Sequence, residues 1–194
     1  MDDVNSKIAQ AEHILAYNFG DELLAAEAIQ MAGPQAFLPV GSRFRTVNNN
    51  KRLAIFGDVA LATALCKKWY KSQDNFGNIQ PPLVWTRIRN DALGNDGLGR
   101  LGEQLGVGSV IVVAAGFMQR PTMNMLATTL EALVGAVYQD GGEDAVSRVV
   151  EHLGLDQHPD LMVTCKGPLP IFEQKQLRLT NMPTFRSLTW GPPG

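Results

Sequence analysis

The sequence has few of the residues that build disulfide-rich or zinc-binding proteins. Only two of its 194 residues are cysteines, Cys66 and Cys165, and they lie far apart with no C-x-x-C pair. This spacing excludes a zinc cluster and a disulfide-bridged framework of the secreted type. The three histidines, His13, His152 and His158, share no spacing that would place two metal ligands on one helix face. We therefore expect no metal site built from cysteine or histidine.

Long apolar runs are also missing. The longest extends from Val107 to Met118, includes two glycines and a serine, and is well short of the ~20 residues that a membrane-spanning helix needs. The first ten residues, MDDVNSKIAQ, are acidic and polar, unlike a signal peptide or an Arg-rich mitochondrial presequence. We therefore expect no membrane association and a cytoplasmic or nuclear location, with a mitochondrial one open if a leader has been removed.

The net charge of −2 conceals a segregation of charge along the chain. Residues 1–42 carry one lysine against six acidic residues, residues 43–100 carry ten Lys or Arg against four, and residues 101–155 carry two against six. A basic segment can contact nucleic-acid phosphates, but its cations can equally form a solvated helix face. Both interpretations stay open. The candidate RNA-binding residues are Lys67, Lys68, Lys71, Arg87 and Arg89.

Apolar residues recur at helical spacing along most of the chain, whereas strand patterns are scarce. A helical hairpin is expected first, its second helix running from Asp21 to the Gly33–Pro34 pair, followed by a loop and a long helix after the Asn48–Asn50 run. Residues 110–113 are interpreted as an extended connector or the start of a buried helix. Further helices are expected at about 85–93, 98–105, 124–139 and 145–153. The pattern predicts an all-α domain over residues 1–155 and an irregular extension over 156–194, where six prolines occur.

Two of the predicted helices resemble the signature helices of the ribonuclease III family. Residues 50–61, NKRLAIFGDVAL, are similar to the family pattern N-E-R-L-E-F-L-G-D-x-x-L. Residues 127–142, ATTLEALVGAVYQDGG, are similar to A-D-x-x-E-A-L-I-G-A-x-Y-x-D-x-G. Other segments follow the family in the same order, so the resemblance covers about residues 8–155. It implies the helical fold of a ribonuclease III endonuclease domain, without the appended RNA-binding domain that many members carry.

The resemblance implies Mg²⁺-assisted hydrolysis of double-stranded RNA by four carboxylates from the two signature helices, with Mn²⁺ as an alternative ion. Asp58 and Glu131 match two of these catalytic, metal-binding positions. Ala54 and Thr128 stand where the other two carboxylates are expected, and Lys51 replaces a further glutamate. Mg²⁺ prefers hard oxygen ligands, so these changes predict weak or absent metal binding.

Three interpretations of this degenerate site follow. The first is a pseudonuclease that forms a homodimer and binds double-stranded RNA or ribonucleoprotein partners, with weak or no cleavage. The second is an active endoribonuclease in which Asp91 or Asp96 and the cation Lys51 compensate for the missing groups. The third is a helical interaction domain in which the motifs serve packing alone. We favour the first.

The family resemblance also implies a homodimer that buries an apolar patch of the first signature helix across a two-fold axis. That helix carries more apolar positions than it can direct into its own core. The predicted dimer residues are Leu53, Ile55, Phe56, Val59 and Leu61.

Overall fold

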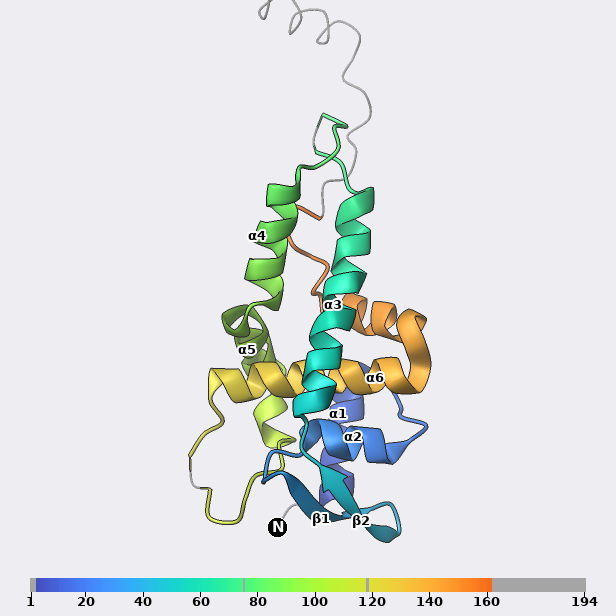
Figure 1. The fold of residues 1–194 in the computed structure, drawn as a ribbon, viewed down its shortest axis with the longest axis vertical. Helices are drawn as coiled ribbons and strands as arrows, with labels where there is room; N and C mark the ends of the chain where they lie inside the picture. Colours follow the sequence, from blue (N-terminus) through green and yellow to red (C-terminus); the bar gives the residue numbers. More distant parts are fainter. Residues whose placement is uncertain (1–2, 75, 118, 162–194) are drawn as a thin grey trace, which may run out of the picture.

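The computed structural model describes residues 3–74, 76–117 and 119–161. The described residues form six α-helices, one short 3-10 helix and one two-stranded sheet (Figure 1). The expected all-α class is therefore confirmed, with a small sheet added. The helices are α1 (Val4–Leu15), α2 (Glu22–Ile29), α3 (Lys51–Lys71), α4 (Pro82–Leu93), α5 (Asn95–Gln104), the 3-10 helix η1 (Val107–Ser109) and α6 (Met123–His152).

Helix α6 is the centre of the fold. Its first part is buried from Leu126 to Val137 almost without interruption, and α2, α3 and α5 all pack against it. Figure 1 shows α6 crossing behind the lower half of α3, with α3 and α4 extending together beyond the core. Gly142, at φ 71° and ψ −165°, interrupts the helical backbone of α6. The two helices expected at 124–139 and 145–153 are thus the two arms of α6.

A carboxylate on α6 holds the turn between α1 and α2. The Tyr17 hydroxyl donates to Asp140 Oδ2 at 2.6 Å, and the backbone N–H groups of Gly20 and Asp21 donate to the same carboxylate at 2.8 and 2.9 Å. Burial alone would raise the pKa of Asp140, but these hydrogen bonds hold it below its ordinary value. Burial, with the hydrogen bond and charge of Asp140, raises the pKa of Tyr17 to about 12. These hydrogen bonds attach the turn between α1 and α2 to α6.

The segment between α2 and α3 differs from the expectation of a loop. Strands β1 (Gln35–Val40) and β2 (Arg43–Asn48) pair as an antiparallel hairpin around a turn at Gly41, where φ is 58°. The hairpin lies at the opposite end of the molecule from the loop between α3 and α4 (Figure 1). Short strands with Pro39 inside one of them give little sequence signal, which explains why the pattern did not reveal them.

The expected end of the second helix at Gly33–Pro34 is wrong. Helix α2 ends at Ile29, and Gln30 adopts an extended backbone that pairs in parallel with Val112. The Met31 N–H donates to the Val112 carbonyl at 2.8 Å, and the Val112 N–H donates to the Ile29 carbonyl at 2.9 Å. Residues 110–113 are therefore an extended connector with a partner about eighty residues earlier in the chain, which local periodicity cannot reveal.

The C-terminal region is described only in part. Residues 156–161 lie against α3 and α4, although the sequence pattern assigned them to the irregular extension. Most of the predicted Pro-rich extension, residues 162–194, lies outside the described residues. Among the described helices, none is both long and apolar enough to cross a membrane.

Candidate functional site

The two signature helices, α3 and α6, cross at a pair of glycines. A Cβ atom on Gly57 would lie 1.8 Å from the carbonyl oxygen of Glu131, and one on Gly135 would lie 2.2 Å from the carbonyl oxygen of Leu53. No side chain fits between the helices at these points, so their backbones are in direct contact. The crossing places Asp58, which follows Gly57, beside Glu131 on α6.

The carboxyl groups of Asp58 and Glu131 act on each other electrostatically. Glu131 is half-buried, and burial followed by the negative charge of Asp58 raises its pKa from 4.5 to about 7. The proton is therefore held to a higher pH than on an ordinary glutamate. Asp58 also faces a cation, because Arg89 Nη2 on α4 lies 3.4 Å from Asp58 Oδ2. The structure thus brings together the two predicted acidic residues and adds Arg89, which sequence reasoning had placed among the RNA contacts.

The remaining predicted site positions supply no further carboxylate to this pair. Ala54 is one helical turn before Asp58 and only 5% exposed, and Thr128 occupies the corresponding place before Glu131 on α6. Lys51 is exposed in the first turn of α3. Of the two aspartates proposed as substitutes, Asp91 Oδ2 lies 3.4 Å from His158 Nε2. Asp96 lies in the exposed first turn of α5.

This donor set does not fit Mg²⁺ or Mn²⁺ at the family position. Mg²⁺ requires several hard oxygen ligands in near-octahedral geometry. Here the site offers two carboxylates, and one of them is paired with Arg89. Within the described ranges, no three His, Cys, Asp or Glu side chains gather in a way that could hold a metal ion. The chain's own groups can accept and donate hydrogen bonds at this site, but they do not form a metal centre.

Most of the predicted RNA-binding cations are paired with acidic side chains. Lys67 pairs with Glu143, Lys68 Nζ lies 2.9 Å from Glu151 Oε1 and 2.8 Å from Asp156 Oδ2, and Arg89 pairs with Asp58. Lys71, in the last turn of α3, is exposed and forms no ion pair within the described part of the chain. A phosphate would have to displace a carboxylate to reach the paired cations.

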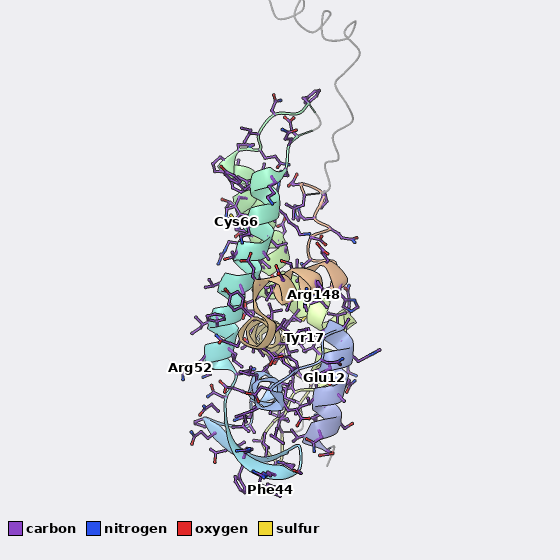
Figure 2. All side chains as sticks on the ribbon, turned by 90° about the vertical axis from the view of Figure 1, so that its right-hand side faces the viewer. Glu12, Tyr17, Phe44, Arg52, Cys66 and Arg148 are labelled. Atoms are coloured by element: carbon purple, nitrogen blue, oxygen red, sulfur yellow. The ribbon has the colours of Figure 1, made fainter. Side chains whose placement is uncertain are left out.

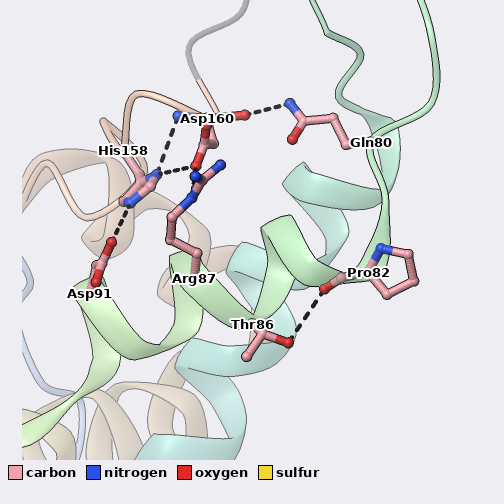
Figure 3. Close-up of polar contacts among 7 residues, drawn as sticks. All are labelled: Gln80, Pro82, Thr86, Arg87, Asp91, His158 and Asp160. Atoms are coloured by element: carbon pink, nitrogen blue, oxygen red, sulfur yellow. Dashed lines mark hydrogen bonds and ion pairs between the residues drawn. The ribbon is translucent and has the colours of Figure 1, made fainter.

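Arg87 is held by residues that follow α6 (Figure 3). Its Nε donates to Asp160 Oδ2 at 2.7 Å, and Gln80 Nε2 donates to the Asp160 carbonyl at 2.7 Å. His158 accepts a hydrogen bond from the Asp160 N–H at 3.2 Å and faces Asp91 on its other ring nitrogen. Sequence reasoning missed this cluster because residues 156–160 show no periodicity that would dock them on α4.

The predicted dimer residues divide into two sets. Ile55 and Val59 are 71% and 60% exposed, and Phe56 is 38% exposed with its ring edge-on to Tyr138 at 5.1 Å. Leu53 and Leu61, by contrast, are buried against α6 in the protomer's own core. The helical period directs positions 53, 57 and 61 to α6 and positions 55 and 59 away from it, so the surface that α3 offers to a second copy consists of Ile55, Phe56 and Val59.

A groove of about 690 Å³ continues from Val59 along the exposed face between α3 and α4. Its walls are mostly apolar, and cations stand at its rim. The lining residues are Asp58, Val59, Ala62, Thr63, Cys66, Lys67, Tyr70, Lys71, Trp85 and Arg89. Asp58 and its partner Arg89 therefore line the same groove as the exposed apolar residue Val59.

Comparison with known proteins relates this arrangement to characterised sequences. Residues 41–157 match the family model described as Ribonuclease-III-like. The Ribonuclease 3 of Syntrophotalea carbinolica is 33% identical over 112 residues, which cover 56% of this chain and 47% of that protein. The Ribonuclease 3 of Nitrosomonas eutropha is 30% identical over 154 residues, which cover 72% and 58%. The chain thus spans about half the length of these two relatives.

Solved structures show the same architecture. The nuclease domain of ribonuclease III from Campylobacter jejuni superposes with a TM-score of 0.59 at 18% identity, covering 77% of this chain and 94% of that one. A second structure of that domain, which concerns structural flexibility in its region involved in dimer formation, also gives a TM-score of 0.59. At this level of identity the similarity concerns the fold alone.

Proposed function

Because the chain belongs to the ribonuclease III family, as its signature segments predicted, we propose that it is a double-stranded-RNA-binding member with weak or no cleavage activity. The observation that carries this proposal is the composition of the acidic site. Two carboxylates remain, Asp58 and Glu131, where the family pattern has four, and Arg89 is paired with one of them.

The site favours binding over hydrolysis for an electrostatic reason. Hydrolysis of a phosphodiester needs an activated water and stabilisation of charge on the pentacoordinate phosphate, which the family's metal ion supplies when it is bound. In this chain Ala54 and Thr128 stand at two of the four carboxylate positions of the family pattern, and Asp58 is paired with Arg89. The site therefore offers few ligands to hold such an ion where it would activate a water.

The proposed ligand is duplex RNA, which the protein would recognise by the shape of the double helix and not by its base sequence. Base edges in an RNA duplex are poorly accessible, so recognition uses phosphates and 2′-hydroxyls across the shallow groove. The basic segment 43–100 supplies the cations, and a homodimer would present two copies of it to one duplex. Binding of this kind is nearly independent of base sequence and weakens steeply with salt. Ribonucleoprotein partners are compatible with such a role.

Cleavage and binding can be tested on one labelled RNA duplex with Mg²⁺ or Mn²⁺ present. We expect binding without cleavage, and we expect Asp58→Asn with Glu131→Gln to bind at least as tightly as the wild type, because it removes the carboxylate that pairs with Arg89. The acidic site is then restored by Ala54→Glu with Thr128→Asp, which completes four carboxylates. Mg²⁺ should raise the melting temperature of this variant and leave that of the wild type unchanged, because a ligand stabilises the state that binds it.

Two results would contradict the proposal. Wild-type cleavage that disappears in Asp58→Asn would show that the site is active with ligands from elsewhere. Failure of the wild type to bind duplex RNA at low salt would leave the packing of α3 on α6 as the only role of the two motifs that the structure supports. Glu103→Gln, an exposed change on α5, is the matched control for loss of one negative charge.

A further inference from the structure

The outward face of the β1–β2 hairpin carries an exposed aromatic pair. The rings of Phe37 and Phe44 stack with centroids 5.2 Å apart and an interplanar angle of 21°, yet the residues are 68% and 63% exposed. The strand register places both on the face that points away from the helices, while Val40 and Val47 on the other face are buried. Figure 2 shows Phe44 at the end of the molecule, clear of the helices. The fold does not use this pair for its own core.

The same segment is basic and contains no acidic residue. Residues 43–52 carry four cations, Arg43, Arg45, Lys51 and Arg52, and residues 35–50 contain no Asp or Glu. Unlike Lys67, Lys68, Arg87 and Arg89, these four form no ion pair within the described part of the chain.

Two acidic side chains lie near this segment. A Cβ on Gly41 would lie 2.9 Å from Glu22 Oε2, and the charge of Arg52 acts on Glu27. Arg43, Arg45 and Lys51 are therefore available to phosphates, as Lys71 is on α3, and they lie on or next to the hairpin that carries the aromatic pair.

The hairpin is held rigidly enough to act as a preformed surface. The Gly41 N–H donates to Asn5 Oδ1 at 2.9 Å, and Asn5 Nδ2 donates to the Gly41 carbonyl at 3.3 Å. At the other end, the Gln30 side chain donates to the Val47 carbonyl at 3.1 Å. A preformed surface loses little conformational entropy when it binds a ligand.

We propose that this hairpin binds unpaired nucleotides of RNA. Bases would stack on Phe37 and Phe44, and Arg43 and Arg45, which project from the opposite face of the ribbon and are exposed at its edge, would contact the phosphates. Exposed aromatics combined with cations are the means by which proteins bind single strands without sequence preference. The absence of acidic residues favours a polyanion over a protein, whose surface would present both signs of charge. This inference rests on the proposed RNA-binding function and adds to it a second, single-strand contact.

The test uses two probes, a blunt RNA duplex of about 16 base pairs and the same duplex with a single-stranded extension of about eight nucleotides. The wild type should bind the extended probe about tenfold more tightly than the blunt duplex, as measured by fluorescence anisotropy. Phe44→Leu should abolish this gain, because leucine keeps the apolar surface and removes the aromatic face, whereas Phe44→Trp should preserve it. The blunt duplex should bind all three proteins equally.

Control variants separate this surface from the rest of the molecule. Phe76→Ala removes another aromatic, 72% exposed, from a turn closed by Asp74, and should leave the gain intact. Arg43→Gln with Arg45→Gln should lower the slope of log K against log salt for the extended probe by about 1.4, at about 0.7 per phosphate contact. Lys67→Gln, whose cation already pairs with Glu143, should change the slope little.

The outcomes distinguish this inference from the proposed function. If the blunt duplex binds and the extension adds nothing, the hairpin does not bind RNA, and duplex binding stands. If only the extended probe binds and Phe44→Leu weakens it, the hairpin contact stands and duplex recognition fails. If Phe44→Leu binds each probe with the same affinity as the wild type, the inference is wrong. The aromatic pair would then be a contact for a protein partner.

Discussion

At the level of single residues, Glu131 is the group whose chemistry the fold changes most. Its pKa is raised to about 7 by burial and by Asp58. The folded state therefore binds more protons than the unfolded state between about pH 4.5 and 7, and stability falls as pH rises through that range. Glu131→Gln removes the half-buried charge, so it should match the wild type at pH 5 and exceed it at pH 8 by about 2 kcal/mol, discounted for partial exposure.

Melting temperatures at pH 5 and pH 8 test this expectation. The exposed Glu103→Gln is the control and should show no such difference between the two pH values. Asp58→Asn should produce part of the same effect, since it removes the like charge that contributes to the shift. A Glu131→Gln protein with the wild-type pH profile would mean that the carboxyl is solvated and unperturbed in solution.

The residue scale also shows what the sequence could predict of the site. The resemblance of the two signature helices to the family pattern predicted that Asp58 and Glu131 lie together, and in the structure the two carboxyls interact. That Ala54 and Thr128 stand in place of metal ligands stays a prediction from that pattern. Motif spacing could not reveal that Arg89 turns toward Asp58, because the partner of a long side chain depends on the packing of α4 on α3. The same limit applies to Lys68 and Arg87, whose acidic partners come from residues 156–160.

At the level of elements, the crossing of α3 and α6 depends on glycine. Among the glycines of the described structure, Gly57 is the one where an added Cβ would approach another atom most closely. Gly57→Ala would drive a methyl group into the backbone of α6, at 1.8 Å from a carbonyl oxygen. Overpacking in cores costs about 1–3 kcal/mol, and a clash with backbone lies at or above the upper end because no side-chain rotation relieves it. We expect a loss of about 3 kcal/mol or more in the free energy of unfolding, measured by urea denaturation.

Gly108→Ala is the matched control for this substitution. A Cβ at Gly108 would lie 3.5 Å from its nearest neighbours, Leu126 and Pro121, which is ordinary contact. Its cost should stay within about 0.5 kcal/mol. Equal stability of the two variants would show that the helices can separate freely at the crossing.

Among the elements, the long helices were predictable and the hairpin was not. The apolar stripe of α3 and the two arms of α6 follow the helical period over many residues, so the sequence located them well. The hairpin depends on the burial of Val40 and Val47 against the helices, and the end of α2 depends on a pairing with Val112. Such contacts between distant segments override local pattern, which is why periodicity missed them.

At the level of the whole molecule, the exposed apolar residues of α3 predict self-association. Ile55 and Val59 are exposed one helical turn apart on α3, Phe56 beside them is partly exposed, and Val59 also lines the 690 Å³ groove. We expect the wild type to sediment as a dimer at micromolar concentration and Ile55→Asp to sediment as a monomer, because a charge at the centre of an apolar interface is buried without a partner.

Ile79→Asp provides the control for an equally exposed isoleucine. Ile79 is 84% exposed in the loop between α3 and α4, at the opposite end of α3 from Ile55. Its substitution should leave the dimer intact. A wild type that sediments as a monomer, or dissociation of both variants alike, would remove the case for an interface at Ile55.

The glycine crossing also bears on how such a domain changes over evolutionary time. A chain of this fold must pack α3 on α6 whether or not it binds a metal, so folding alone excludes a side chain at Gly57 and Gly135. The carboxylates that remain are then kept side by side by the backbone, whether or not the protein cuts RNA. The motif that identifies the family is therefore partly a record of helix packing, and it can outlast the reaction for which its acidic residues first served.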